Sequence, residues 1–130
     1  MDGLRSYAFV SVFVAHAADG ELAPPEMATV RENVHRVGSH LGHSQAQTEG
    51  LLRQAIDEYW ETLADEGPAA VLKRYRKEVQ ELGRCFGPDP STLRAIQRDL
   101  AAIAQADGTF ADMERFLIDG VGRTWEREQA

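Results

Sequence analysis

Four acidic residues within a repeated segment are the side chains of this sequence best suited to chemistry. The segment ADGELAPPE at residues 18–26 aligns without gaps with ADGTFADME at residues 106–114, and five of the nine positions are identical. The acidic residues at matching positions are Asp19 and Glu26 in the first copy and Asp107 and Glu114 in the second. Carboxylate oxygens are the ligands that hard cations such as Mg²⁺, Ca²⁺ and Mn²⁺ prefer. The repeat therefore predicts a cation site if the two copies converge.

Each copy is typical of an elbow between two helices. Asp-Gly ends the first helix, because glycine readily adopts the left-handed conformation common just beyond a helix C-terminus. A hydrophobic residue, Leu22 or Phe110, follows two positions later, and the glutamate falls in the first turn of the next helix. A pseudo-twofold arrangement of the elbows would bring four carboxylates together, where they would repel one another without a cation. His16, one turn before Asp19, is a possible additional ligand.

The elbow residues also have a purely structural interpretation. Asp-Gly commonly marks the end of a helix, and a glutamate near a helix N-terminus favours the free N–H groups and the positive end of the dipole. The EF-hand loop is excluded, because its ligands recur at every second position over twelve residues. The spacing alone leaves both interpretations open.

Apolar residues recur three and four positions apart through most of the chain, which predicts an all-α fold. The first segment, residues 4–18, also contains valines that suit a strand. A helix over its apolar run would rise only about 18 Å, too short to span a membrane, so we expect a buried core helix. Further helices are expected from Pro24-Pro25, after an N-cap at Ser44, from Ala69 and from Pro90. A last helix is expected after Asp107-Gly108, through Met113, Leu117, Val121 and Trp125. Short connections predict a single domain, residues 1–130, built as a compact bundle of six to seven helices with an internal pseudo-twofold repeat.

Charge and cysteine content limit the function classes. The chain has 14 basic and 21 acidic side chains and a net charge of −7, which disfavours nucleic acid as a partner. The single cysteine, Cys85, cannot form an internal disulfide, and no secretory signal is recognisable, so a cytoplasmic protein is expected. One basic run, KRYRK at residues 73–77, predicts a solvated helix face with Tyr75 in the core, or a surface that docks an acidic partner, anionic lipid or nucleic acid.

No catalytic constellation assembles in this sequence. The GxSxG, P-loop and GxGxxG motifs are missing, and the four histidines do not form a zincin pair, so we expect a non-enzymatic protein. His35, His40 and His43 are expected to be solvated or core histidines. Trp60 and Trp125 fall on apolar stripes and are expected to be packing residues.

The doubled pattern of an apolar helix ending in Ala-Asp-Gly, a hydrophobic residue two positions later and a glutamate opening a second helix resembles the TerB-like tellurite-resistance domain. The resemblance implies an all-α domain of about seven short helices and an acidic cluster proposed to bind divalent metal. In this sequence the acidic positions are Asp19, Glu26, Asp107 and Glu114. The chain departs from the family at Ala23 and Ala111, where a serine or threonine often completes a capping box with the glutamate.

The resemblance also implies a function. TerB-like domains belong to tellurite and chemical-stress resistance systems, and a related domain occurs in membrane-linked J-domain co-chaperones. We therefore expect a non-enzymatic domain that binds a divalent cation, with Ca, Mg, Mn and Zn not distinguished, and that has protein partners in a stress-response assembly. Nucleic acid is not expected, and any peripheral membrane association would run through partners. The alternative is a metal-free protein-interaction module, of scaffold or co-chaperone type, that docks through a helical face.

Overall fold

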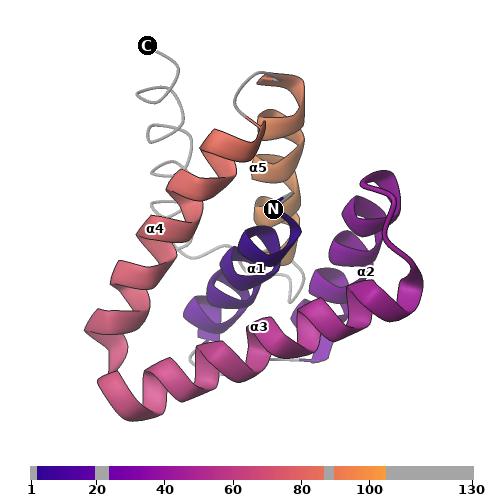
Figure 1. Cartoon of the computed structure of the whole chain (residues 1–130). Coiled ribbons are helices and arrows are strands. Elements are labelled where there is room, and N and C mark those ends of the chain that lie inside the picture. The colour runs from indigo at the N-terminus through magenta and orange to yellow at the C-terminus, as the bar shows by residue number, and fades with distance from the viewer. Residues whose placement is uncertain (1–2, 20–23, 87–89, 105–130) are drawn as a thin grey trace.

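One helix, α1 (Leu4–Asp19), lies at the centre of the protein. The structure, a computed structural model, describes residues 3–19, 24–86 and 90–104. Four more helices surround α1 in these ranges (Figure 1): α2 (Pro24–His40), α3 (Gln45–Glu66), α4 (Pro68–Phe86) and α5 (Pro90–Ala104). These ranges hold no strand, so the predicted all-α class is confirmed. The predicted sixth helix, and with it the second copy of the repeat, lies outside the described residues.

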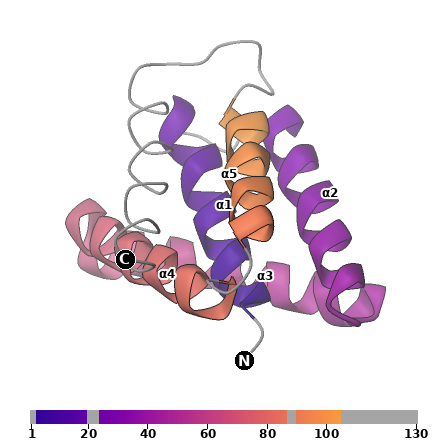
Figure 2. The same ribbon diagram turned by 90° about the horizontal axis from the view of Figure 1, so that it is seen from above.

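The four outer helices form a closed ring around α1. Each outer helix packs against α1, and α2 packs on α3, α3 on α4, α4 on α5, and α5 back on α2. Figure 2 shows the two helices that close the ring, α2 and α5, with α1 beside them. No helix of the described residues is long and apolar enough to cross a membrane.

Because it is enclosed, α1 is buried over nearly its whole length. Tyr7, Phe9, Val10, Val12 and Val14 are at most 1% exposed, although they point to different sides of the helix. The valines that also suited a strand are thus explained by a helix without a solvent face. Burying each large apolar side chain stabilises the fold by about 1.5–3 kcal/mol, so α1 is the main part of the core.

The outer helices are amphipathic and turn one stripe toward α1. In α4 the buried residues recur at intervals of four and three, at Val71, Tyr75, Val79 and Leu82. The predicted position of Tyr75 in the core is therefore confirmed, and it stacks on Phe13 of α1 with ring centroids 4.1 Å apart. The periodicity that identified the helices also identifies their buried faces.

Local signals set the ends of α3. Ser44 forms the predicted capping box: its hydroxyl accepts from the Gln47 N–H at 3.1 Å, and the Gln47 side chain accepts from the Ser44 N–H at 2.8 Å. At the other end Gly67 has a φ of +89°, which disfavours any residue with a Cβ. Pro68 then opens α4 one residue earlier than predicted, since proline suits the first position of a helix.

A partly buried polar cluster joins α1, α2 and α5. The Tyr7 hydroxyl donates to Asp99 Oδ2 at 3.0 Å, and Arg36 pairs with Asp99 Oδ1 at 2.6 Å. The Asn33 side chain donates to the Asp99 backbone oxygen at 3.4 Å. Burial, with the charge of Asp99 beside it, raises the pKa of Tyr7 far above its ordinary value, so the hydroxyl remains a donor. This group fixes the register of α5 against α1 and α2.

The backbones of α2 and α3 approach closely at Gly38. A Cβ added there would lie 2.5 Å from Thr48 Oγ1 and 3.0 Å from Thr48 Cγ2. Thr48 is buried, and its hydroxyl donates to the Ser44 carbonyl at 3.0 Å, so it has little freedom to move away. Gly50 of α3, in contrast, has open space around it.

Alanine substitutions at these two glycines should have opposite effects on the stability of the fold. Gly38→Ala should destabilise the fold by about 1–3 kcal/mol, because the contact with Thr48 outweighs the gain in helix propensity. Gly50→Ala should stabilise it by about 0.5–1 kcal/mol, because nothing opposes that gain. Urea unfolding followed by far-UV circular dichroism measures both. Equal stabilisation by the two alanines would contradict the close packing of α2 on α3.

Candidate functional site

The first elbow lies between α1 and α2, as predicted. α1 ends at Asp19, and α2 begins at Pro24, so that Glu26 occupies its first turn. The second elbow begins beyond the end of α5 at Ala104. Asp107 and Glu114 lie outside the described residues, and the side chains of Asp19 and Glu26 are also undescribed.

The helices that lead to the two elbows point toward the same end of the bundle. In Figures 1 and 2 the last turns of α1 and α5 and the first turn of α2 lie at that end. The contacts of Asp99 give the register, because they place it level with Tyr7 of α1 and with Asn33 of α2. Distances from this level toward the elbow end of the bundle follow from the helical rise of about 1.5 Å per residue. They are about 8 Å for Ala104, about 11 Å for Glu26 and about 18 Å for Asp19.

His16, the additional ligand considered with the elbows, is half-buried in an aromatic cluster near the end of α1. Its Nδ1 shares a hydrogen bond with the Tyr59 hydroxyl, and its ring meets Tyr59 and Trp60 edge to face, with centroids 5.3 and 5.1 Å away. Burial raises the pKa of Tyr59 to about 12, so this hydroxyl is protonated at neutral pH. A cation at Nε2 would require the tautomer with hydrogen on Nδ1, and His16 would then donate to the Tyr59 oxygen.

Trp60 packs on neighbouring rings, as expected, and it does so at the surface. It is 40% exposed, and it is the one large hydrophobic side chain that is exposed in the described part of the chain. Its ring covers His16 and Tyr59 rather than reaching α1's apolar core. Trp125 lies outside the described residues.

His35 belongs to a polar cluster between α2 and α3 that contains the Arg31–Glu49 ion pair. Its Nε2 lies 3.0 Å from Glu49 Oε1, and Arg31 donates to the same oxygen at 2.8 Å. Among the side chains that the structure describes, no three histidine, cysteine, aspartate or glutamate residues group closely enough to hold a metal ion. His35 therefore serves to join two helices.

The interactions of the Glu49 carboxylate should contribute to stability in a pH-dependent way. The hydrogen bond with His35, together with Arg31, lowers the pKa of Glu49 below its ordinary value. A group with a lowered folded-state pKa stabilises the protein above its unfolded pKa, and this stability disappears as the pH falls through the folded value. Glu49→Gln should therefore cost less than about 1 kcal/mol at neutral pH, because the carboxylate is 39% exposed.

The difference between wild type and Glu49→Gln should vanish in acid, where Glu49 is protonated in both states. Chemical unfolding at a series of pH values measures it. Glu61→Gln is the control, because Glu61 is an exposed residue of the same helix with no ion pair in the described residues. A pH-independent cost for Glu49→Gln would contradict the ion pair.

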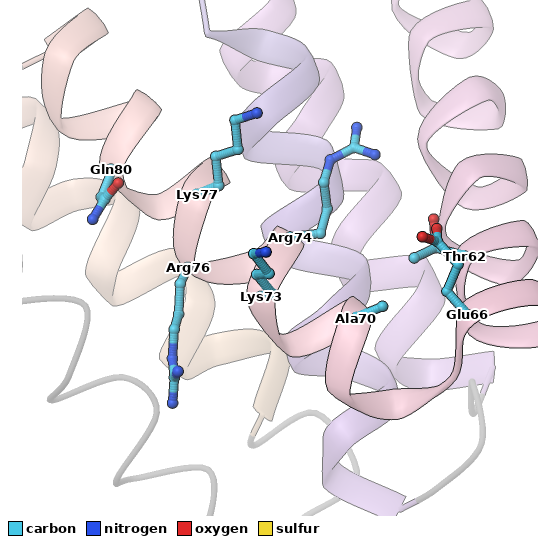
Figure 3. A pocket seen from close by; sticks show the side chains of 8 residues that line it. All are labelled: Thr62, Glu66, Ala70, Lys73, Arg74, Arg76, Lys77 and Gln80. Atoms are coloured by element: carbon cyan, nitrogen blue, oxygen red, sulfur yellow. The ribbon is translucent and has the colours of Figure 1, made fainter.

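A basic groove runs between α3 and α4 (Figure 3). Its volume is about 510 Å³. Thr62 and Glu66 line it from α3, and Ala70 and Gln80 line it from α4. The rest of its wall is the four cations of the basic run, Lys73, Arg74, Arg76 and Lys77. The run is thus a helix face, as predicted, and it borders a hollow.

The four cations of the groove differ in their partners. Arg74 pairs with Glu58 of α3 and Glu78 of its own helix, at 3.0 Å each, and its guanidinium lies 4.8 Å from the ring centroid of Phe9. Glu58 also pairs with Arg5 of α1. Arg74 therefore has a structural role. Lys73, Arg76 and Lys77 are exposed and form no ion pair within the described ranges.

Comparisons of the chain with protein-family models, with curated proteins and with solved structures find no match. The resemblance to the TerB-like domain thus depends on the repeat at residues 18–26 and 106–114.

Proposed function

We propose that this chain is a non-catalytic, TerB-like module of a tellurite or chemical-stress resistance system, which binds a divalent cation between its two elbows. One observation carries the proposal: α1 and α5, which precede the elbows, end on the same side of the bundle where α2 begins. Had these helices ended on opposite sides, a shared site would require a long connection. Their common direction supports convergence of Asp19, Glu26, Asp107 and Glu114.

The length of chain between α5 and the second elbow is consistent with a shared site. Asp107 is three positions beyond Ala104, and three residues of chain span at most about 10 Å. Ala104 is about 3 Å short of the level of Glu26 and about 10 Å short of the level of Asp19. Asp107 is therefore within reach of both levels.

The distribution of charge gives independent support. Residues 1–66 hold 4 basic and 11 acidic side chains, and residues 101–130 hold 3 and 6, so these parts carry −7 and −3. Residues 67–100 hold 7 and 4, a net +3. The acidic excess lies in the segments that contain the elbows, where a divalent cation would relieve the repulsion between carboxylates.

Calorimetric titration of the full chain with Ca²⁺, Mg²⁺, Mn²⁺ and Zn²⁺ tests the proposal. At least one ion should bind, and Asp19→Asn/Asp107→Asn should weaken its binding by about a hundredfold or more, because affinity for hard cations depends on the number of charged ligands. The bound ion should also raise the unfolding free energy of the wild type, by about 2.7 kcal/mol at a hundred times its Kd.

The matched control is Asp57→Asn/Asp65→Asn, which removes the same charge from two exposed positions of α3. This variant should bind the ion as the wild type does. If no ion binds the wild type, or if both double variants bind equally well, the elbows do not form a cation site.

A second candidate function is protein docking without a metal. The observation that favours it is the group of exposed cations, Lys73, Arg76 and Lys77, that line the groove without an ion pair in the described part of the chain. Arginine and lysine side chains left uncompensated on one face attract an acidic surface. Docking through α4 needs no metal, so it should persist when a chelator removes divalent ions, which separates it experimentally from the cation site.

A further inference from the structure

We infer that the groove between α3 and α4 binds a short acidic peptide segment of a partner protein. The inference rests on the docking function of α4 and is independent of the cation site, because it uses none of the elbow residues. It specifies the chemistry of the partner: a short run of carboxylates that lies along the groove beside α4.

The cations that form no ion pair within the described residues follow one another along the exposed side of α4. Lys73 and Lys77 are four residues apart, and Arg76 follows Lys73 by three, so all three lie within about one turn and Lys73 neighbours each of the other two on the helix surface. The groove extends from Ala70 to Gln80, about 15 Å along the helix axis. A peptide of about five extended residues has this length. Its carboxylates could therefore meet all three cations at once.

The walls of the groove are suited to a peptide backbone as well as to its carboxylates. Ala70 is small and leaves room, and Thr62 and Gln80 provide hydrogen-bonding groups for a main chain. The aliphatic stems of the lysines add apolar surface beneath the charges. Figure 3 shows Thr62 on α3, and Ala70, Gln80 and the two lysines on α4.

Arg74 holds the groove in shape rather than competing for the ligand. Its pairs with Glu58 and Glu78 join α4 to α3, and Glu58 extends the connection to Arg5 of α1. Arg74, the cation nearest the core, is thus compensated by carboxylates, whereas the three outer cations have no ion pair within the described residues and remain for a partner. Glu66 lines the groove near the start of α4 and would repel an acidic residue there, so the carboxylates of the peptide are expected toward Lys77.

The surroundings of the groove favour a peptide over a nucleic acid or a membrane. The phosphates of a nucleic-acid duplex would extend beyond this short basic patch, toward Glu66, Glu78 and Glu81. They would be repelled there, on a chain whose net charge is −7. Binding to a membrane surface would be favoured by several exposed large hydrophobic side chains beside the cations. In the described residues one large hydrophobic side chain is exposed, that of Trp60 in α3. A short acidic peptide requires neither feature.

Fluorescence anisotropy with a labelled decaglutamate peptide and the full chain tests the inference. Binding should saturate, should weaken as NaCl rises from about 50 to about 500 mM, and should be undetectable for the decaglutamine peptide. Lys73→Glu/Arg76→Glu/Lys77→Glu should weaken binding by about tenfold or more. The variant should keep the helical content and thermal midpoint of the wild type, since all three positions are exposed.

The control is Arg53→Glu/Arg94→Glu/Arg98→Glu, which makes the same change in net charge at exposed positions of α3 and α5. This variant should bind within about threefold of the wild type. An equal loss in both triple variants, or no binding of decaglutamate by the wild type, would overturn the acidic-peptide site.

Two further probes separate this inference from the docking function on which it rests. They are a short DNA duplex and phosphatidylcholine vesicles containing one-third phosphatidylserine. If either binds through Lys73, Arg76 and Lys77 more tightly than decaglutamate does, the peptide inference is wrong and the groove still docks a partner. If none of the three probes binds, the docking function fails as well.

Discussion

The structure depends on the burial of α1 on every side. A helix with Tyr7, Phe9, Val10 and Val12 pointing in different directions has no face that water can cover at low cost. Two neighbouring helices would leave part of α1 exposed to water. The four outer helices therefore close into a ring around it. Closing the ring brings α2 and α5 together although they are far apart in the sequence.

The polar group around Asp99 determines how the ring closes. Apolar packing between α5 and its neighbours tolerates shifts along the helix axis, but the contacts of one carboxylate with Tyr7 and Arg36 do not. Asp99 is 18% exposed, so the loss of a partner would leave a charge in largely apolar surroundings. The register set here decides where α5 ends relative to α1 and α2. It therefore links a core interaction to the geometry of the elbows.

The sequence predicted local features better than long-range ones. Periodicity predicted the described helices, and the Ser44 capping box and the Gly67-Pro68 boundary were recognisable because the residues concerned are neighbours in the chain. The partners of Asp99 lie 92 and 63 positions away at Tyr7 and Arg36, and no local pattern identifies them. The exposure of Trp60 was not predicted, because an apolar stripe shows which face turns inward but not how far the neighbouring helices extend over it. The basic run was visible in the sequence, whereas its hollow depends on Thr62 and Glu66 of another helix.

Charge connects the two candidate functions without any shared residue. A chain with a net charge of −7 repels an acidic partner at long range, even though the groove on α4 attracts it locally. A divalent cation at the elbows would reduce that net charge to −5 and lower the repulsion, so cation binding and docking would favour each other. Salt screens charges over about 8 Å at physiological ionic strength, which makes the mutual effect small there and larger in dilute buffer. Because thermodynamic coupling is reciprocal, the acidic partner would strengthen cation binding by the same factor. A helix rearrangement linking the sites would instead give a coupling that persists in high salt, so salt dependence distinguishes charge from conformation as its cause.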